Sequence, residues 1–379
     1  MIKYNEEHEI FRESLKKFID NEIVPYIDEW EEKREIPLSL WKKMGSLGYL
    51  CPFVDEEYGG SGVGFEYSVI IIEELGKVNV GLGIATHNDI LVPYLTKYAT
   101  EEQKKRWLPG CTTGDYIMAV AMSEPDTGSD VSAIKATAVK DGDDYIINGS
   151  KTFITNGSLT NLVVLACKTD LKAKPRTNGV SLFVVEEGAP GFSKGNKLNK
   201  LGLHIEGTAE LFFDNCRVPK SNLLGEEGKG FYYLMSGLQR ERLVICTWGQ
   251  IMAEQILKEG IEYAKTREAF GQPIGNFQHN AFKIAEMATE VELGRTFLDK
   301  LTTDFIDGKD IVTKVSMAKW WIAEMANRIA YQCLQLHGGY GYMEEYPICR
   351  LFRDVRAQTL YAGTTEIMKL IISRNLGFR

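Results

Sequence analysis

One glutamate lies on what is otherwise an apolar helix face. In the segment 231-FYYLMSGLQRERLVICTWGQIMAEQI-256 this face repeats at steps of three and four residues and comprises Leu234, Leu238, Glu241, Ile245, Trp248, Met252 and Ile256. Burial disfavours the charged form of a carboxylate, so the pKa of Glu241 should rise toward the range useful for a general base. A buried ion pair or hydrogen bond, for example with Arg242 or with a helix across the interface, explains the same pattern, and the periodicity alone does not separate a base from such a structural role.

Two segments near the middle of the chain combine small hydroxyls with tight turns. The first, 118-MAVAMSEPDTGSD-130, reads as a strand that runs into a turn containing Pro125 and Asp126. The second, 150-SKTFITNG-157, places an aromatic residue and a threonine before an Asn-Gly turn. Taken separately, each segment also fits an ordinary surface loop.

These two segments, with three later ones, resemble the acyl-CoA dehydrogenase family. The later segments are 266-TREAFGQPIGNFQ-278, 334-LQLHGGYGYMEEYP-347 and 360-LYAGTTEIMKLIISRN-375. The five segments occur in the family's order and span essentially the whole chain. The resemblance implies an α+β fold with an N-terminal helical domain, a central antiparallel β-domain and a C-terminal four-helix bundle. It also implies an FAD-dependent oxidoreductase of the β-oxidation type, which acts on a CH–CH bond of an acyl-CoA.

The resemblance further implies which residues contact FAD. Ser123 and the nearby backbone would bind the pyrimidine edge of the flavin, and Thr155 would face flavin N5. Phe153 would cover the flavin edge where the family often has Trp, but without an indole N–H. The implied contacts between residues 267 and 339 would reach the FAD of a neighbouring subunit, so a homotetramer is expected. The full set is Ala121, Ser123, Phe153, Thr155, Arg267, Phe270, Gln278, Gln335, Gly339, Thr364 and Glu366.

Plainer explanations stay open for several of these residues. Arg267 also fits a solvated charge at a helix C-terminus, and Thr364 also fits a helix N-cap. The glycines at 338, 339 and 341 fit either a close approach of the backbone to a ligand or a plain turn.

Many family members carry their catalytic base in the motif Y-E-G-T, where this chain has Ala362. Isovaleryl-type and long-chain-type members carry it instead in L-x-x-E-R-L, which matches residues 238–243. The resemblance therefore implies that Glu241 removes the α-proton while FAD takes the β-hydride. Ala362 keeps its backbone N–H just before the last helix, where it would bind the thioester oxygen. The other implied substrate contacts are Ser129, Arg242, Tyr361 and Gly363.

A second carboxylate lies in the segment 84-IATHNDILVPYL-95, which by the resemblance closes the acyl pocket. Asp89 fits a helix N-cap before the run that starts at Ile90. It also fits a second acid or base opposite Glu241, as a 1,4-dehydrogenation of an alicyclic acyl-CoA would require. Without a carboxylate at position 362 the site has room for a branched or cyclic acyl group. A flavin acyl-CoA oxidase and a non-catalytic acyl-CoA-binding protein are further alternatives.

The apolar pattern divides the chain into three parts that would position these residues. Residues 1–115 and 221–379 show helical periodicity, as at Ile10, Leu15, Phe18 and Ile19. Residues 116–220 carry short strands instead, with a hairpin at Asp141-Gly142 and apolar runs at 162–167, 180–185 and 210–215. In the last helix, Gly363-Thr364-Thr365-Glu366 reads as the start, with Ile367, Leu370 and Ile371 as its buried stripe.

The composition of the chain indicates which binding partners and which cell compartment to expect. A net charge of -8 argues against nucleic acid or an anionic membrane as partner, and 44% apolar with 25% charged residues is typical of a soluble protein. Seven cysteines without CxxC or zinc spacing, and no signal peptide, suggest reduced thiols in a cytoplasm and no metal site. The family default for the electron acceptor is an electron-transfer flavoprotein.

Overall fold

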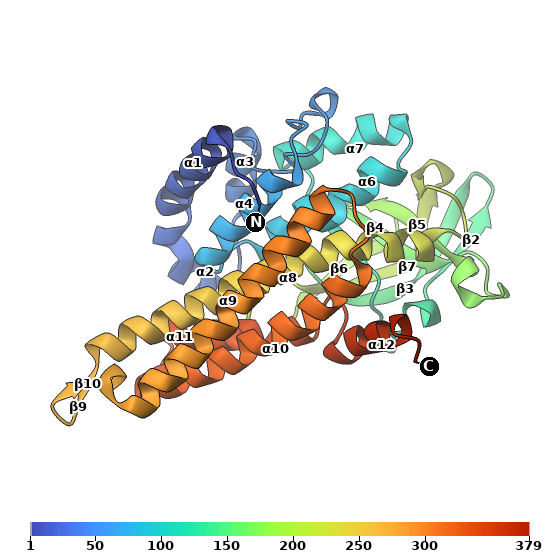
Figure 1. Cartoon of the computed structure of the whole chain (residues 1–379). Coiled ribbons are helices and arrows are strands. Elements are labelled where there is room, and N and C mark those ends of the chain that lie inside the picture. Colours follow the sequence, from blue (N-terminus) through green and yellow to red (C-terminus); the bar gives the residue numbers. More distant parts are fainter. Residues whose placement is uncertain (1, 379) are drawn as a thin grey trace.

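The computed structural model describes residues 2–378, and its N-terminal part is helical (Figure 1). At the start of the first helix, the Asn5 side chain accepts from the His8 N–H at 3.0 Å and the His8 ring accepts from the Asn5 N–H at 3.1 Å, a reciprocal cap. Leu15, Phe18 and Ile19 are buried as predicted, but Ile10 is 64% exposed. The main helices here are α1 (Glu6–Glu22), α2 (Ile27–Lys33), α3 (Leu38–Ser46), α4 (Phe65–Lys77), α5 (Leu82–Thr86), α6 (Val92–Tyr98) and α7 (Glu101–Thr113).

An eight-stranded sheet follows, in the order β6-β7-β3-β2-β4-β5-β8, with β1 paired to β4. Its strands are β1 (Met118–Ala121), β2 (Thr137–Asp141), β3 (Asp144–Ile154), β4 (Leu162–Lys168), β5 (Val180–Glu186), β6 (Phe192–Lys197), β7 (Ala209–Pro219) and β8 (Leu223–Leu224). The predicted hairpin joins β2 to β3, and the three predicted apolar runs are β4, β5 and β7. The sheet is mostly antiparallel, but β1 and β2 run parallel to β4. Strand β6, FSKGNK, was not predicted because it lacks an alternating apolar face.

Strand β4 explains why the central runs are continuously apolar rather than alternating. Val163, Leu165 and Cys167 belong to the core inside the β-domain. Their neighbours Leu162, Val164 and Ala166 belong to the larger core shared with the helices. Both faces of the strand are therefore covered, which favours an unbroken apolar sequence.

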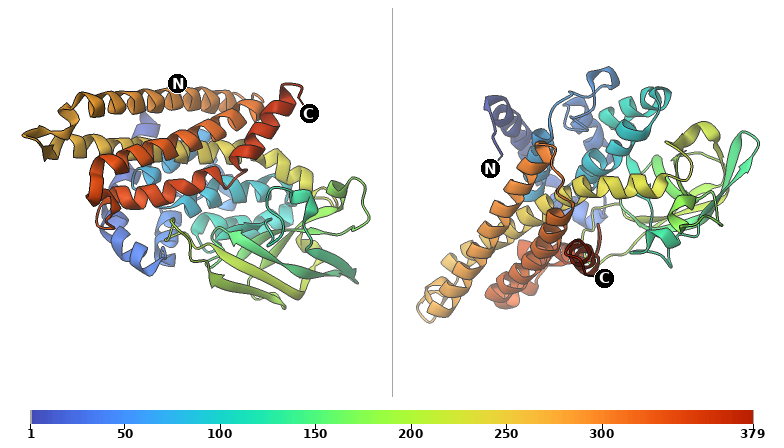
Figure 2. Two further views of the ribbon diagram at one scale, coloured as in Figure 1. Left: turned by 90° about the horizontal axis from the view of Figure 1, so that it is seen from below. Right: turned by 45° about the vertical axis from the view of Figure 1, so that its right-hand side comes forward.

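Long helices form the C-terminal part and extend away from the sheet (Figure 2). Helix α8 contacts both α9 and α10, and it also packs against α4 of the N-terminal part. Helix α12 begins after the N-cap Thr364, as predicted, but its buried side chains are Thr365 and Met368 rather than the predicted stripe. The elements are α8 (Gly230–Thr266), β9 (Glu268–Ala269), β10 (Gln272–Pro273), α9 (Gln278–Ile306), α10 (Val312–His337), α11 (Pro347–Val355) and α12 (Thr365–Asn375).

All seven cysteines are free thiols and are buried. Within residues 2–378, no helix combines the length and the apolar character needed to cross a membrane.

Candidate active site

Glu241 is buried on α8, with 6% of its surface exposed. The Tyr94 hydroxyl, on α6, donates a hydrogen bond of 2.6 Å to Glu241 Oε1. Burial raises the pKa of Glu241 to about 7, although the Tyr94 hydrogen bond and the positive charge of Arg242 act in the opposite direction. A carboxyl group with this pKa exchanges its proton readily near neutral pH, as a general base must.

Gly237, one turn before Glu241, makes room for this pair. A Cβ at position 237 would lie 2.9 Å from Glu241 Oε1 and 3.0 Å from the Tyr94 hydroxyl oxygen. Any side chain there would have to displace the carboxylate or the tyrosine. Sequence reasoning missed the Tyr94 contact, because the two residues are distant in the chain and only the fold brings them together.

Of the plainer explanations for a buried Glu241, the hydrogen bond is present, from Tyr94, whereas an ion pair with Arg242 is not formed among residues 2–378. Arg242 Nη1 instead donates to Ser316 Oγ on α10 at 3.3 Å, and its Nε has no partner within those residues. A Cβ on Gly363 would lie 3.9 Å from Arg242 Nη2. Arg242, next to Glu241 in the chain, therefore reaches the loop that precedes α12.

That loop holds Ala362 in a conformation uncommon for alanine. Ala362 has φ +52° and Gly363 has φ +93°, both in the left-handed region. Within residues 2–378, the Ala362 N–H has no hydrogen-bond acceptor. Thr364 acts as an N-cap, since its hydroxyl accepts from the Ile367 N–H at 3.3 Å, and Glu366 is exposed in the first turn of α12. The loop therefore offers a backbone donor just before a helix N-terminus.

The segments 118–130 and 150–157 of the β-domain are joined by a buried ion pair that the sequence did not reveal. Lys151 Nζ lies 2.9 Å from Glu124 Oε1, and their side chains are 0% and 5% exposed. Lys151 also donates to the Met122 carbonyl at 3.0 Å, and the Thr152 N–H donates to the Ser123 carbonyl at 3.0 Å. These contacts fix the ends of β1 and β3, where Ala121 and Ser123 lie, against each other.

The pairing of β3 with β7 is irregular between Lys151 and Ile154, where Phe153 has φ +58°. This irregularity turns the Phe153 ring outward, so that 72% of its surface is exposed, and Thr155 is half-buried beyond it. Backbone strain held in place by surrounding structure is common at ligand sites.

A second group of predicted residues gathers at the far end of the C-terminal bundle. Arg267, which caps α8, lies 5.5 Å from the centre of the Tyr340 ring. Phe270 is 96% exposed, and nothing lies within 4 Å of a Cβ placed on Gly339. At about 1.5 Å of rise per residue, Arg267 lies about 39 Å from Glu241 along α8. The two groups therefore cannot contact the same part of one ligand.

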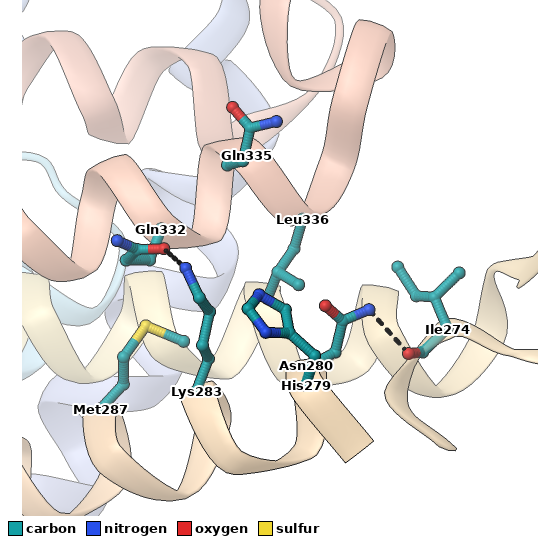
Figure 3. A pocket seen from close by; sticks show the side chains of 8 residues that line it. All are labelled: Ile274, His279, Asn280, Lys283, Met287, Gln332, Gln335 and Leu336. Carbon is teal, nitrogen blue, oxygen red and sulfur yellow. Dashed lines mark hydrogen bonds between the residues drawn. The ribbon is translucent and has the colours of Figure 1, made fainter. Parts of the chain in front are cut away.

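A pocket of about 360 Å³ lies between α9 and α10 in this region and is lined in part by Gln335. Figure 3 shows Gln332 and Leu336 pointing from α10 toward α9, whereas the Gln335 amide points away from α9. Lys283 on α9 donates to Gln332 Oε1 at 2.9 Å, which links the two helices across the pocket. Gln278 is the first residue of α9.

The prediction that Asp89 caps a helix is wrong. Asp89 lies inside a π-helical turn, His87–Leu91, between α5 and α6, and its side chain caps nothing. Its fully buried carboxylate pairs with Arg240 Nη2 at 2.5 Å, while its Oδ2 has no partner within residues 2–378. The Arg240 guanidinium also lies 4.3 Å from the centre of the Phe53 ring.

The residues present near the loop before α12 fit a bound polar ligand, such as the expected FAD or acyl-CoA. The Tyr361 hydroxyl and Arg242 Nε are buried and have no partner in the described part of the chain, and the Ala362 N–H has no acceptor there. Buried polar groups normally find partners, so such groups clustered in one loop region point to a bound ligand. Gly128 and Gly339 both border open space, into which a Cβ would point freely.

Comparisons with known proteins identify the family to which the chain belongs. Three family models match: acyl-CoA dehydrogenase N-terminal domain (residues 5–115), middle domain (119–216) and C-terminal domain (228–377). The mitochondrial long-chain specific acyl-CoA dehydrogenase of Sus scrofa is 44% identical over 374 residues, which cover 98% of this chain and 87% of that protein. Mitochondrial isovaleryl-CoA dehydrogenase of Pongo abelii is 38% identical, with coverage of 98% and 88%. The crystal structure of acyl-CoA dehydrogenase from Geobacillus kaustophilus is 56% identical, covers 98% of both chains and has a TM-score of 0.98.

Proposed function

Because the chain belongs to the acyl-CoA dehydrogenase family, whose members are FAD-dependent oxidoreductases acting on CH–CH groups, we propose that it converts an acyl-CoA to a 2-enoyl-CoA with Glu241 as base. The observation that carries this proposal is the buried Glu241 carboxylate, with a pKa raised to about 7 and a hydrogen bond from Tyr94. When bound, FAD supplies the acceptor for the hydride that leaves Cβ.

The chain's own residues then have separate tasks. Tyr94 occupies Oε1 of Glu241 and so leaves Oε2 to take the α-proton. The Ala362 N–H binds the thioester oxygen and stabilises the negative charge that develops there as the proton leaves. Arg242, Tyr361 and Gly363 line the same region and orient the thioester.

The FAD contacts fall into two groups. The first group holds the flavin of its own chain and consists of Ala121, Ser123, Phe153 and Thr155. Thr364 and Glu366 contact the rest of the same FAD molecule. Arg267, Phe270, Gln278, Gln335 and Gly339 reach the FAD of a neighbouring subunit in a homotetramer. The separation of about 39 Å between Arg267 and Glu241 supports this division. A guanidinium suits a pyrophosphate because its planar donors match the phosphate oxygens.

We further propose a branched or cyclic acyl group as the preferred substrate, because position 362 carries only a methyl group. A second candidate is the 1,4-dehydrogenation of an alicyclic enoyl-CoA with Asp89 as the second acid or base. Its support is Oδ2 of buried Asp89, which has no partner within residues 2–378, on a turn that packs against α8. The Arg240 ion pair gives Asp89 a structural task as well. Asp89→Asn separates the two: a loss confined to cyclic substrates supports the catalytic task, and an equal loss on all substrates refutes it.

The proposed electron acceptor is an electron-transfer flavoprotein, for which the exposed Phe153 ring marks the accessible edge of the flavin site. The proposed compartment is the cytoplasm, which suits seven free thiols. A flavin oxidase would instead pass electrons to oxygen, so rapid reoxidation of the reduced enzyme in air would replace this proposal with that one.

The experiment that tests the function is anaerobic mixing of the FAD-loaded protein with straight, branched and cyclic acyl-CoAs. Loss of the flavin absorbance with at least one of them, together with the matching 2-enoyl-CoA as product, is expected. Ligand binding without any loss of flavin absorbance would identify a non-catalytic binding protein.

A further inference from the structure

Lys319, on α10, is a buried lysine with 1% of its surface exposed. Its Nζ donates to the Gln358 carbonyl at 2.8 Å and to the Gly363 carbonyl at 2.6 Å. Burial lowers the pKa of Lys319 to about 8, so the side chain is still mostly protonated at neutral pH. A buried ammonium is retained only where specific acceptors compensate for its lost hydration, and here both acceptors belong to one loop.

The two carbonyls bracket the loop that carries Ala362. Between them the chain leaves a short 3₁₀ turn, Arg356–Thr359, and enters the left-handed conformations of Ala362 and Gly363 before α12. Alanine adopts such a conformation only where its surroundings hold it there. The buried Lys319 side chain holds the loop by donating hydrogen bonds to backbone carbonyls on both sides of Ala362.

The same face of α10 also anchors Arg242. Ser316, one turn before Lys319, accepts a hydrogen bond of 3.3 Å from Arg242 Nη1 on α8. Helix α10 therefore connects the helix that carries Glu241 with the loop that carries the Ala362 N–H, and α8 and α10 are in extensive contact. A small shift of the loop would move the N–H donor relative to the carboxylate.

We propose that Lys319 is a positioning residue that holds the Ala362 N–H where it can bind the thioester oxygen. The inference rests on the proposed function, in which this N–H stabilises the developing enolate. It goes further by assigning to a side chain outside the substrate and cofactor contacts the placement of the oxyanion donor. Loss of Lys319 should weaken stabilisation of the anion much more than it weakens binding of the acyl-CoA.

The test uses the FAD-loaded protein with Lys319→Met, Lys319→Gln and, as matched control, Lys314→Met, an exposed lysine on the same helix. The probe is a 3-oxoacyl-CoA, which carries an acidic α-proton and whose bound anion perturbs the flavin spectrum. Titration of that spectrum with pH gives the apparent pKa of the bound ligand. A purely structural loss changes the amount of folded protein but leaves this value in the folded fraction unchanged.

We expect Lys319→Met to raise the pKa of the bound ligand by about one unit or more, so that at a pH below this pKa the anion fraction is about tenfold smaller. The kcat should fall about 10- to 100-fold, while KM stays within about threefold of the wild-type value. Lys319→Gln keeps an uncharged, shorter donor group, so its ligand pKa and kcat should lie between those of Lys319→Met and wild type. Lys314→Met should match wild type. Amide hydrogen exchange across residues 358–364 should accelerate in both Lys319 variants only.

A wild-type ligand pKa in Lys319→Gln overturns the inference, even if Lys319→Met does not fold. So does unchanged exchange in the loop together with unchanged kcat. If the wild-type protein itself neither ionises the probe nor oxidises acyl-CoA, the proposed function fails instead, and the two failures are therefore distinguishable.

Discussion

Replacing Tyr94 with Phe should move the pH dependence of turnover in a direction that the Glu241 site fixes. Tyr94→Phe removes the 2.6 Å hydrogen bond that the hydroxyl donates to Glu241 Oε1 and leaves the buried ring in place. That hydrogen bond favours the ionised carboxylate, whose pKa is already raised to about 7 by burial. Its loss must therefore raise the pKa further.

The size of the shift follows from the energy of a hydrogen bond to a charged group, about 1.5–3 kcal/mol. At about 1.4 kcal/mol per pKa unit, the carboxyl group should titrate about one to two units higher. At pH 7 the ionised fraction then falls from about half to about 1–10%, a loss of roughly 5- to 50-fold in kcat/KM. At pH values above the new pKa most of the activity should return.

The assay is kcat/KM as a function of pH, whose rise on the acid side reports ionisation of the base in the free enzyme. Tyr98→Phe is the matched control, because Tyr98 is on the same helix and its hydroxyl contacts Ser236 rather than Glu241. An acid limb that stays in place in Tyr94→Phe, or that moves to lower pH, would show that Glu241 is not the titrating base.

Three further changes have expected outcomes. Burial raises the pKa of Glu241 from 4.5 to about 7, so the unfolded chain releases this proton first and stability falls as pH rises between those two values; Glu241→Gln should therefore raise Tm relative to wild type much more at pH 8 than at pH 5, and equal Tm differences at both would contradict the burial argument. Lys151→Met leaves the Glu124 carboxylate buried without its ion-pair partner, so the free energy of unfolding should fall by about 3–5 kcal/mol and FAD should be retained poorly. In the control Lys140→Met, at an exposed lysine, the free energy of unfolding should hardly change. Similar losses in both variants would argue against the buried pair. Arg267→Ala should weaken FAD retention about 10- to 100-fold on dilution without changing the oligomer mass, and full retention would remove Arg267 from the cofactor site.

Much of the site was predictable because its residues carry local signals. The step pattern around Glu241 predicted its burial, and Thr364 predicted the start of α12. The prediction that Asp89 caps a helix was wrong because an Asn-Asp pair before an apolar run looks the same in an N-cap and in a π-helical turn. An apolar stripe such as Ile367, Leu370 and Ile371 predicts that something covers it, but not that the same chain does.

The remaining features depend on contacts between distant segments. Tyr94 meets Glu241, Glu124 meets Lys151, and Lys319 meets the loop before α12, and none of these pairs has a local pattern in the chain. Their polar atoms are buried only once the three parts of the chain are packed together. Each pair is therefore apparent only from the fold.

The central claim is that Glu241 removes the α-proton, and one measurement tests it most directly. Wild type and Glu241→Gln, each loaded with FAD, are mixed anaerobically in a stopped-flow instrument with an acyl-CoA that reduces the wild-type flavin. Glu241→Gln should bind the acyl-CoA, as a small spectral shift shows, while its flavin absorbance falls at least about 1,000 times more slowly than in wild type. Flavin reduction in Glu241→Gln at a rate near that of wild type would contradict the account.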